Sequence, residues 1–147
     1  MLYFAYGSNM DPDQMATRCP NTSAVGPARL AGWRLTFTRD SPGWGGGVGH
    51  IELAPGDEVW GVLWDATEAD MAALDEYEGV AAGAYVRDRV SVVGGDGAAV
   101  EADVYIAVPR GYKQPSRRYL DALLRGAEAH GLPATYIERL RTLVPPS

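Results

Sequence analysis

Glu78 has the residue type and the spacing expected of a buried proton acceptor. It follows Met71 by seven positions and Leu74 by four, so in a helix the three side chains share one face. The two apolar residues indicate that this face is buried, and burial raises the pKa of a carboxyl group above its ordinary value of about 4.3. Such a group suits general acid–base catalysis near neutral pH. The alternative is an acid that faces water or pairs with an arginine such as Arg87.

A second candidate is the turn Tyr6-Gly7-Ser8-Asn9, where an aromatic strand gives way to a helix start. Glycine allows a ligand to approach the backbone closely, and successive N–H groups in such a turn can bind a carboxylate or a polarised carbonyl. The alternative is a plain connection in which Asn9 forms the turn. Ser8 lacks the surroundings of a nucleophile, because no second glycine follows it two residues later.

The sequence offers few residues for other kinds of chemistry. With one cysteine, Cys19, and two histidines, His50 and His130, neither a disulfide nor a cysteine- or histidine-based metal site is expected. The run Gly45–Gly47 lacks the following lysine and hydroxyl residue of a phosphate-binding loop. Four tyrosines could donate hydrogen bonds to a polar ligand, although aromatic residues more often form the core: Tyr85, Tyr105, Tyr112 and Tyr119.

Composition limits the partners of this chain of 147 residues, of which 46% are hydrophobic and 22% charged. These values predict one domain, residues 1–147. The net charge of −6 and the scattered basic residues argue against nucleic acid or an anionic membrane and favour a small-molecule partner. The longest apolar run, Val59–Trp64, is too short to span a membrane, and the first residues lack the basic start of a signal peptide. A cytoplasmic location is therefore expected.

These side chains are to be positioned by strands in the middle of the chain and helices at its edges. Strand patterns cover 2–6, 33–39, 48–53, 59–66, 85–93 and 100–107, with a turn at 54–58 and a hairpin at 94–97. Helix signals cover about 12–18, 67–79, 116–131 and the residues after Pro133. Because strands and helices do not alternate regularly, we predict an α+β fold with a small mixed, curved or barrel-like sheet flanked by helices.

Two motifs at a fixed separation carry a resemblance to a known family. Tyr3-Phe-Ala-Tyr-Gly-Ser-Asn-Met10 and Leu74-Asp-Glu-Tyr-Glu-Gly-Val80 resemble the γ-glutamylcyclotransferase family, with its AIG2-like and BtrG-like relatives. Further segments are similar in order and spacing, so that the resemblance covers nearly the whole chain: 55–64, 83–85, the helix with Tyr119, and 131–133 through 143–145.

The resemblance implies a mixed barrel flanked by helices and an enzyme that needs neither a metal nor an organic cofactor. The reaction is cyclisation of a γ-glutamyl unit to 5-oxoproline, with release of the attached amino acid or amine. Glu78 corresponds to the catalytic acid/base. The expected substrate-binding residues are Tyr3, Phe4, Ala5, Tyr6, Gly7, Ser8, Asn9, Tyr85 and Tyr119.

Three alternatives remain for the function, and the oligomeric state is open. The chain could act on γ-glutamyl-amines, could remove a γ-glutamyl protecting group in biosynthesis, or could be a non-catalytic binding module. Its glycines in Trp44–Val48 replace bulkier family residues, which affects the leaving-group side of the pocket. Related proteins include dimers, so a homodimer is also considered.

Overall fold

A closed barrel forms the centre of the computed structural model, which describes residues 1–144. Pro145, the last residue of the 143–145 motif, lies outside the described residues. The strands follow one another around the barrel in the order β1-β3-β2-β4-β5. Their bounds are β1 Leu2–Ala5, β2 Ser23–Ser41, β3 Gly46–Asp65, β4 Tyr85–Gly94 and β5 Ala99–Ala107.

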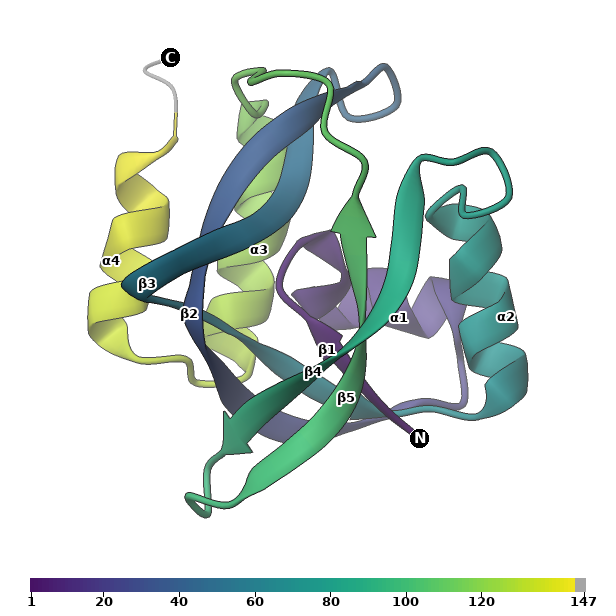
Figure 1. The fold of residues 1–147 in the computed structure, drawn as a ribbon, viewed down its shortest axis with the longest axis vertical. Coiled ribbons are helices and arrows are strands. Elements are labelled where there is room, and N and C mark those ends of the chain that lie inside the picture. The colour runs from purple at the N-terminus through teal and green to yellow at the C-terminus, as the bar shows by residue number, and fades with distance from the viewer. Residues whose placement is uncertain (145–147) are drawn as a thin grey trace.

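The sheet is mixed, as the sequence predicts (Figure 1). The β1–β5 pair is parallel, whereas β1–β3, β2–β3, β2–β4 and β4–β5 are antiparallel. The β4–β5 hairpin turns at Gly94–Gly97, where a positive φ of 81° at Gly97 favours glycine. The predicted α+β fold with a barrel-like sheet is confirmed.

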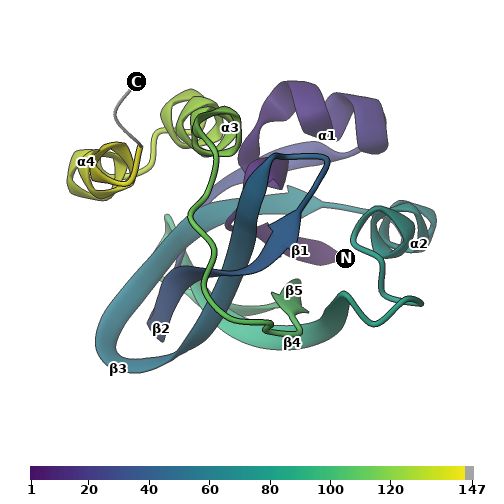
Figure 2. The ribbon, with the colours of Figure 1, turned by 90° about the horizontal axis from the view of Figure 1, so that it is seen from above.

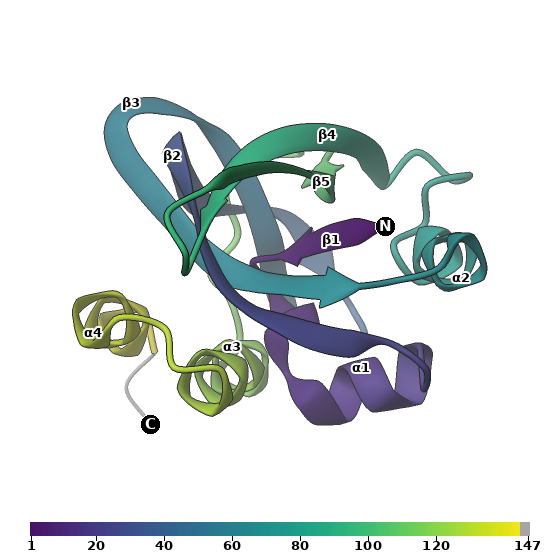
Figure 3. The same cartoon turned by 90° about the horizontal axis from the view of Figure 1, so that it is seen from below.

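Helices lie on the outside of the barrel. They are the 3-10 turn η1 Ser8–Met10 and the α-helices α1 Pro12–Arg18, α2 Glu68–Tyr77, α3 Arg117–Ala129 and α4 Ala134–Thr142. Figures 2 and 3 show α1, α3 and α4 along one side, with α2 apart from them near the N-terminus. No helix among the described residues is long and apolar enough to cross a membrane.

Local capping residues set the starts of the helices. Asp11 accepts a hydrogen bond from the Asp13 N–H at the start of α1, and Ser116 caps α3. Thr67 and Asp70 form a capping box at α2, in which each side chain accepts from the other's backbone N–H. All three signals are local in sequence, and the structure confirms the predicted starts.

The long β2–β3 hairpin corrects the prediction of separate strands at 48–53 and 59–66. β3 continues through residues 54–58, because its pairing with β2 resumes after an irregularity. Ala31 opposes Glu58 and Trp33 opposes Leu53, so several β3 residues bulge opposite Gly32. The expected turn is therefore a bulge within one bent strand.

Two hydrophobic clusters stabilise this arrangement. One contains only residues from the strands and Tyr6, with members on all five strands such as Phe4, Ile51 and Val104, and fills the barrel. The other packs helices against the barrel and includes Met71 and Leu74 of α2. Because successive residues of a strand face opposite sides, β1 divides its side chains between the two clusters.

Candidate active site

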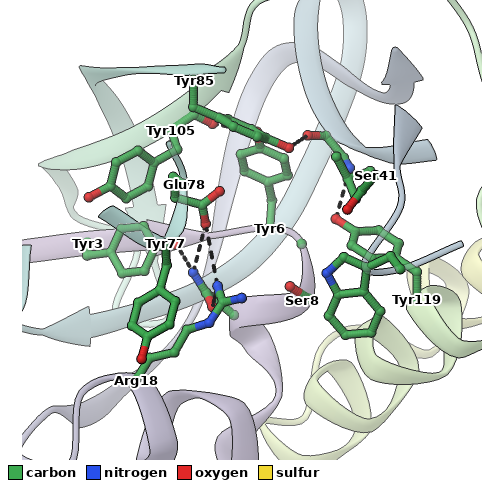
Figure 4. Close-up of a pocket in the computed structure, with 15 residues that line it drawn as sticks. Tyr3, Tyr6, Ser8, Arg18, Ser41, Tyr77, Glu78, Tyr85, Tyr105 and Tyr119 are labelled. Carbon is green, nitrogen blue, oxygen red and sulfur yellow. Dashed lines mark hydrogen bonds and ion pairs between the residues drawn. The ribbon is translucent and has the colours of Figure 1, made fainter. Parts of the chain in front are cut away.

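One pocket opens where the end of β1, the η1 turn, α1, the end of α2 and α3 meet β3 and β4 (Figure 4). We call it the Glu78 pocket. Its volume is about 120 Å³, which suits a ligand group of amino-acid size. It is lined by Tyr3, Tyr6, Gly7, Ser8, Asn9, Arg18, Ser41, Trp44, Val48, Gly49, Tyr77, Glu78, Tyr85, Tyr105 and Tyr119.

Glu78 enters this pocket from the C-terminal cap of α2. Its N–H donates to the Leu74 carbonyl, and Gly79 then adopts a positive φ of 66° that ends the helix. The helical position keeps Glu78 on the face of Met71 and Leu74, both fully buried, and only 18% of its side chain is exposed. Glu76 lies on the exposed side of the same helix. The helical spacing therefore predicted the inward direction of Glu78.

Burial raises the pKa of Glu78 from 4.5 to about 7. Two neighbours oppose this effect: the Arg18 guanidinium, with Nη1 3.8 Å from Oε1, and the Asn9 amide, which donates to Oε1 at 3.2 Å. Both contacts use Oε1, which leaves Oε2 without a partner among residues 1–144. Arg87, the pairing alternative considered from the sequence, lies 3.5 Å from Asp75 instead.

Asn9 holds the Glu78 carboxylate in place through both ends of its amide. Its Nδ2 donates to the Tyr3 hydroxyl at 2.9 Å as well as to Glu78. Its Oδ1 accepts from Gln14 Nε2 at 2.9 Å and from Arg18 Nη1 at 3.0 Å. Since Asn9 is buried and engaged by four partners, the structure places it as a support for Glu78 more than as a free ligand group.

The turn before Asn9 approaches Tyr119 closely. A Cβ atom at Gly7 would lie 2.8 Å from the Tyr119 hydroxyl oxygen, so glycine is needed for contact rather than for an unusual φ. Ser8 accepts a hydrogen bond from Gln14 Nε2 at 2.7 Å, which is a structural role for its hydroxyl. The predicted close approach at this turn is thus made by a side chain of the protein itself.

Buried tyrosines form the opposite wall. The Gly49 N–H donates to the Tyr119 hydroxyl at 2.9 Å, and the Tyr85 hydroxyl donates to the Gly49 carbonyl at 2.8 Å. Burial raises the pKa values of both phenols above 10, so they stay protonated at neutral pH. Because Tyr119 accepts from Gly49, its own O–H remains available to a ligand in the pocket.

The segment 108–116 explains the glycines at 46 and 47, which precede the pocket residues Val48 and Gly49. The Gly47 N–H donates to the Gln114 carbonyl, and a Cβ at Gly47 would lie 2.0 Å from the Lys113 carbonyl oxygen. The glycines therefore let the segment 108–116 pack across the end of the β2–β3 hairpin. Trp44, in the turn beside them, places its ring edge against Tyr119 at 5.2 Å between centroids.

Two of the residues expected from the sequence do not line the pocket. Phe4 is fully buried in the barrel cluster, and Ala5 is buried against the helices. The alternation of side chains along a strand predicts this result, since Tyr3 and Phe4 must face opposite sides of the sheet. Sequence reasoning missed Arg18, which lies in no recognised motif. It also missed Trp44 and Tyr77, which lie in segments that it singled out for other residues. Tyr105 was considered only as a general hydrogen-bond donor.

Metal ligands are not gathered in the described part of the chain. No group of three or more histidine, cysteine, aspartate or glutamate side chains in residues 1–144 is placed to hold a metal ion. The charged side chains that line the Glu78 pocket are Glu78 and Arg18. The chemistry within reach is therefore proton transfer next to a guanidinium and a set of phenols.

Comparison with known proteins gives consistent results. The model of the AIG2-like family matches residues 58–140. The γ-glutamylcyclotransferases of Homo sapiens and Mus musculus are each 36% identical over 98% of this chain and 79% of their own length. A solved structure described as γ-glutamyl cyclotransferase superposes with a TM-score of 0.96 at 35% identity, covering all of this chain and 89% of that one.

Proposed function

This chain belongs to the γ-glutamylcyclotransferase family, and we propose that Glu78 is the base with which it converts a γ-glutamyl unit into 5-oxoproline. The substrate class is a small γ-glutamyl compound with a free α-amine. The observation that carries the assignment of Glu78 is a single buried carboxylate with a pKa of about 7 in a pocket of amino-acid size. Acids with such values are typical of proton-transfer sites.

The first step is removal of a proton from the substrate's α-ammonium group. An α-amine is mostly protonated at neutral pH and cannot attack a carbonyl in that form. Glu78 Oε2, which has no partner among residues 1–144, accepts this proton. A carboxylate with a pKa of about 7 is a stronger base than one at 4.5, so burial favours the transfer.

The freed amine then attacks its own γ-carbonyl carbon, and a five-membered ring closes. The carbonyl oxygen becomes negative in this step and needs hydrogen-bond donors. The Tyr119 O–H, across the pocket from Glu78 in Figure 4, and the backbone N–H groups of the Gly7–Asn9 turn are the donors proposed for this oxygen. The walls hold the chain of the substrate folded, so that amine and carbonyl stay close.

Breakdown of the tetrahedral intermediate completes the reaction. The bond between the γ-carbon and the leaving nitrogen breaks as protonated Glu78 returns its proton to that nitrogen. The carboxylate then accepts the second proton of the ring nitrogen, which leaves a neutral lactam, and passes it to the released amine, which departs as an ammonium ion. The products are 5-oxoproline and the free amino acid or amine, and no water is consumed. One carboxyl group therefore serves as base and then as acid within one turnover.

Product analysis with purified protein and γ-glutamyl-alanine tests this function. Cyclisation yields 5-oxoproline and alanine, whereas hydrolysis yields glutamate and alanine. A panel of γ-glutamyl amino acids, γ-glutamyl-amines and glutathione then separates the substrate alternatives. Formation of glutamate, or no reaction with any member of the panel, would contradict the proposal.

The assembly and location of the protein stay predictions. A homodimer is proposed from the family resemblance alone, and sedimentation at several protein concentrations checks it. The cytoplasmic location is a prediction from the sequence, and fractionation of cells that produce the protein checks it.

A further inference from the structure

We propose that Arg18 binds the α-carboxylate of the γ-glutamyl unit and thereby selects substrates that carry this group. The inference rests on the proposed function and adds to it a residue that determines specificity. Arg18 is the last residue of α1, and its side chain reaches the Glu78 pocket with 18% of its surface exposed.

The guanidinium group of Arg18 is held in place, but some of its N–H groups donate no hydrogen bond within residues 1–144. Its carbon lies 4.7 Å from the centroid of the Tyr77 ring, which orients the plane. Both polar contacts, to Asn9 Oδ1 at 3.0 Å and to Glu78 Oε1 at 3.8 Å, use Nη1. A guanidinium has five N–H donors, so those on Nε and Nη2 have no partner among residues 1–144. A carboxylate is the group that such a planar set of donors binds best.

The two charges in the pocket match the two charges of an α-amino acid. Glu78 and Arg18 are the charged side chains that line it, and they lie side by side. A γ-glutamyl unit carries an ammonium and a carboxylate on one carbon atom. With the ammonium on Glu78, the α-carboxylate lies two bonds away, next to Arg18. Each charge then meets its opposite where both protein side chains are only 18% exposed, which strengthens the attraction relative to bulk water.

The same geometry argues against the other carboxylate of a γ-glutamyl dipeptide. The carboxylate of the leaving amino acid lies beyond the γ-carbonyl carbon, on the far side of the bond that breaks. When the α-amine is held at Glu78, that end of the substrate extends toward Ser41 and Tyr119, which lie across the pocket from Arg18 (Figure 4). The turn Gly7–Asn9 and Tyr119 are then left for the γ-carbonyl oxygen.

Three substrates separate these roles in the wild-type protein and in Arg18→Gln. γ-Glutamyl-alanine carries both carboxylates, and γ-glutamyl-ethylamine lacks the one on the leaving group. 4-Aminobutanoyl-alanine lacks only the α-carboxylate and cyclises to 2-pyrrolidinone and alanine. A hydrogen-bonded charge pair is worth about 10- to 100-fold in affinity. At pH 8.5, where Glu78 is ionised in both proteins, we expect Arg18→Gln to lower kcat/KM by this factor, mainly through KM, for both γ-glutamyl compounds. For 4-aminobutanoyl-alanine we expect a loss of less than about 3-fold.

Other patterns would overturn the proposal. An equal loss with all three substrates means that Arg18 only positions Glu78. A loss with γ-glutamyl-alanine but not with γ-glutamyl-ethylamine assigns Arg18 to the leaving group's carboxylate. Arg18→Lys keeps the charge but not the planar donors and should recover part of the loss. Arg141→Gln, which removes an exposed arginine paired with Glu128 and Glu138, is the matched control.

Direct binding of the product keeps the test independent of turnover. Titration calorimetry compares 5-oxoproline, which retains the α-carboxylate, with 2-pyrrolidinone, which does not. The wild-type protein should prefer 5-oxoproline by about 10- to 100-fold, and Arg18→Gln should lose that preference. Equal preference in the two proteins would refute the role of Arg18. If no substrate yields a cyclised product, but the wild-type protein still prefers 5-oxoproline and Arg18→Gln does not, the proposed function is refuted and the role of Arg18 is supported.

Discussion

Lowering the pH from 7.5 to 5.5 should almost abolish activity, because the working form of Glu78 is the carboxylate. With a pKa of about 7, the ionised fraction falls from about 76% to about 3% over this interval. With the ordinary value of 4.5 it would stay near 91% at pH 5.5. The two cases differ about 30-fold at one pH, so the burial of Glu78 is measurable as a rate.

The groups around Glu78 set the pH at which activity falls, which is the acidic limb of the pH profile. The Arg18 guanidinium from α1 and the Asn9 amide from η1 stabilise the carboxylate and lower its pKa, whereas desolvation raises it by more. Burial holds the pKa values of five phenols in the pocket above 10: Tyr3, Tyr6, Tyr85, Tyr105 and Tyr119. Near neutral pH, Glu78 is therefore the pocket group expected to titrate.

The assay is kcat/KM for γ-glutamyl-alanine between pH 4.5 and 8.5, with product measured by chromatography. A single acidic limb near pH 7 is expected, and the residual activity of Glu78→Gln should lack it. Removal of the nearby cation in Arg18→Gln should move the limb to higher pH. A limb below pH 5 in the wild-type protein, or the same limb in Glu78→Gln, would refute the buried-base mechanism.

Four further results are expected. Glu78→Gln should lower kcat at least about 100-fold, whereas the exposed Glu76→Gln should change it little. Because folding raises the pKa of Glu78, the folded protein binds more protons than the unfolded chain between about pH 4.5 and 7, and it loses stability as the pH rises through that window. The free energy of unfolding of Glu78→Gln in urea should therefore exceed that of the wild type by about 1–3 kcal/mol at pH 8, and the difference should vanish at pH 4. Gly47→Ala should displace the Lys113 backbone and lower the free energy of unfolding by about 1–3 kcal/mol, which is measured as a lower urea midpoint. Dialysis against EDTA should leave the rate unchanged, and recovery of a lost rate by added zinc would contradict the mechanism.

Elements that depend on neighbours in sequence were predictable. The caps at Asp11, Thr67 and Ser116 require only residues two or three positions away, and all three begin helices where expected. The β2–β3 hairpin was not, because β3 passes through residues 54–57, which have no partner in β2, and resumes its pairing at Glu58 with the distant Ala31. A proline and a glycine in that segment indicate a turn locally, and the sheet incorporates them as a bulge.

In the candidate site, too, the features set by residues close in sequence could be predicted and the others could not. The inward direction of Glu78 follows from the period of its own helix, and the outward direction of Glu76 follows with it. The resemblance implies that every residue of Tyr3–Ser8 binds substrate, although alternate residues of a strand cannot all face one pocket. Phe4 therefore belongs to the barrel core, whereas Tyr3 meets Asn9 at the base of the site.

Arg18 shows why the remainder of the site required three dimensions. In sequence it is the last residue of a short helix, sixty positions before the acid it faces, and nothing in its surroundings marks it. Its place is fixed by Asn9, which accepts from it while donating to Glu78, and by the ring of Tyr77 on another helix. Desolvation raises the pKa of Glu78 by more than the Arg18 guanidinium, 3.8 Å away, and the shared Asn9 amide lower it, so the value stays near 7. The same separation leaves the other guanidinium donors to the substrate, so basicity and recognition depend on one side chain.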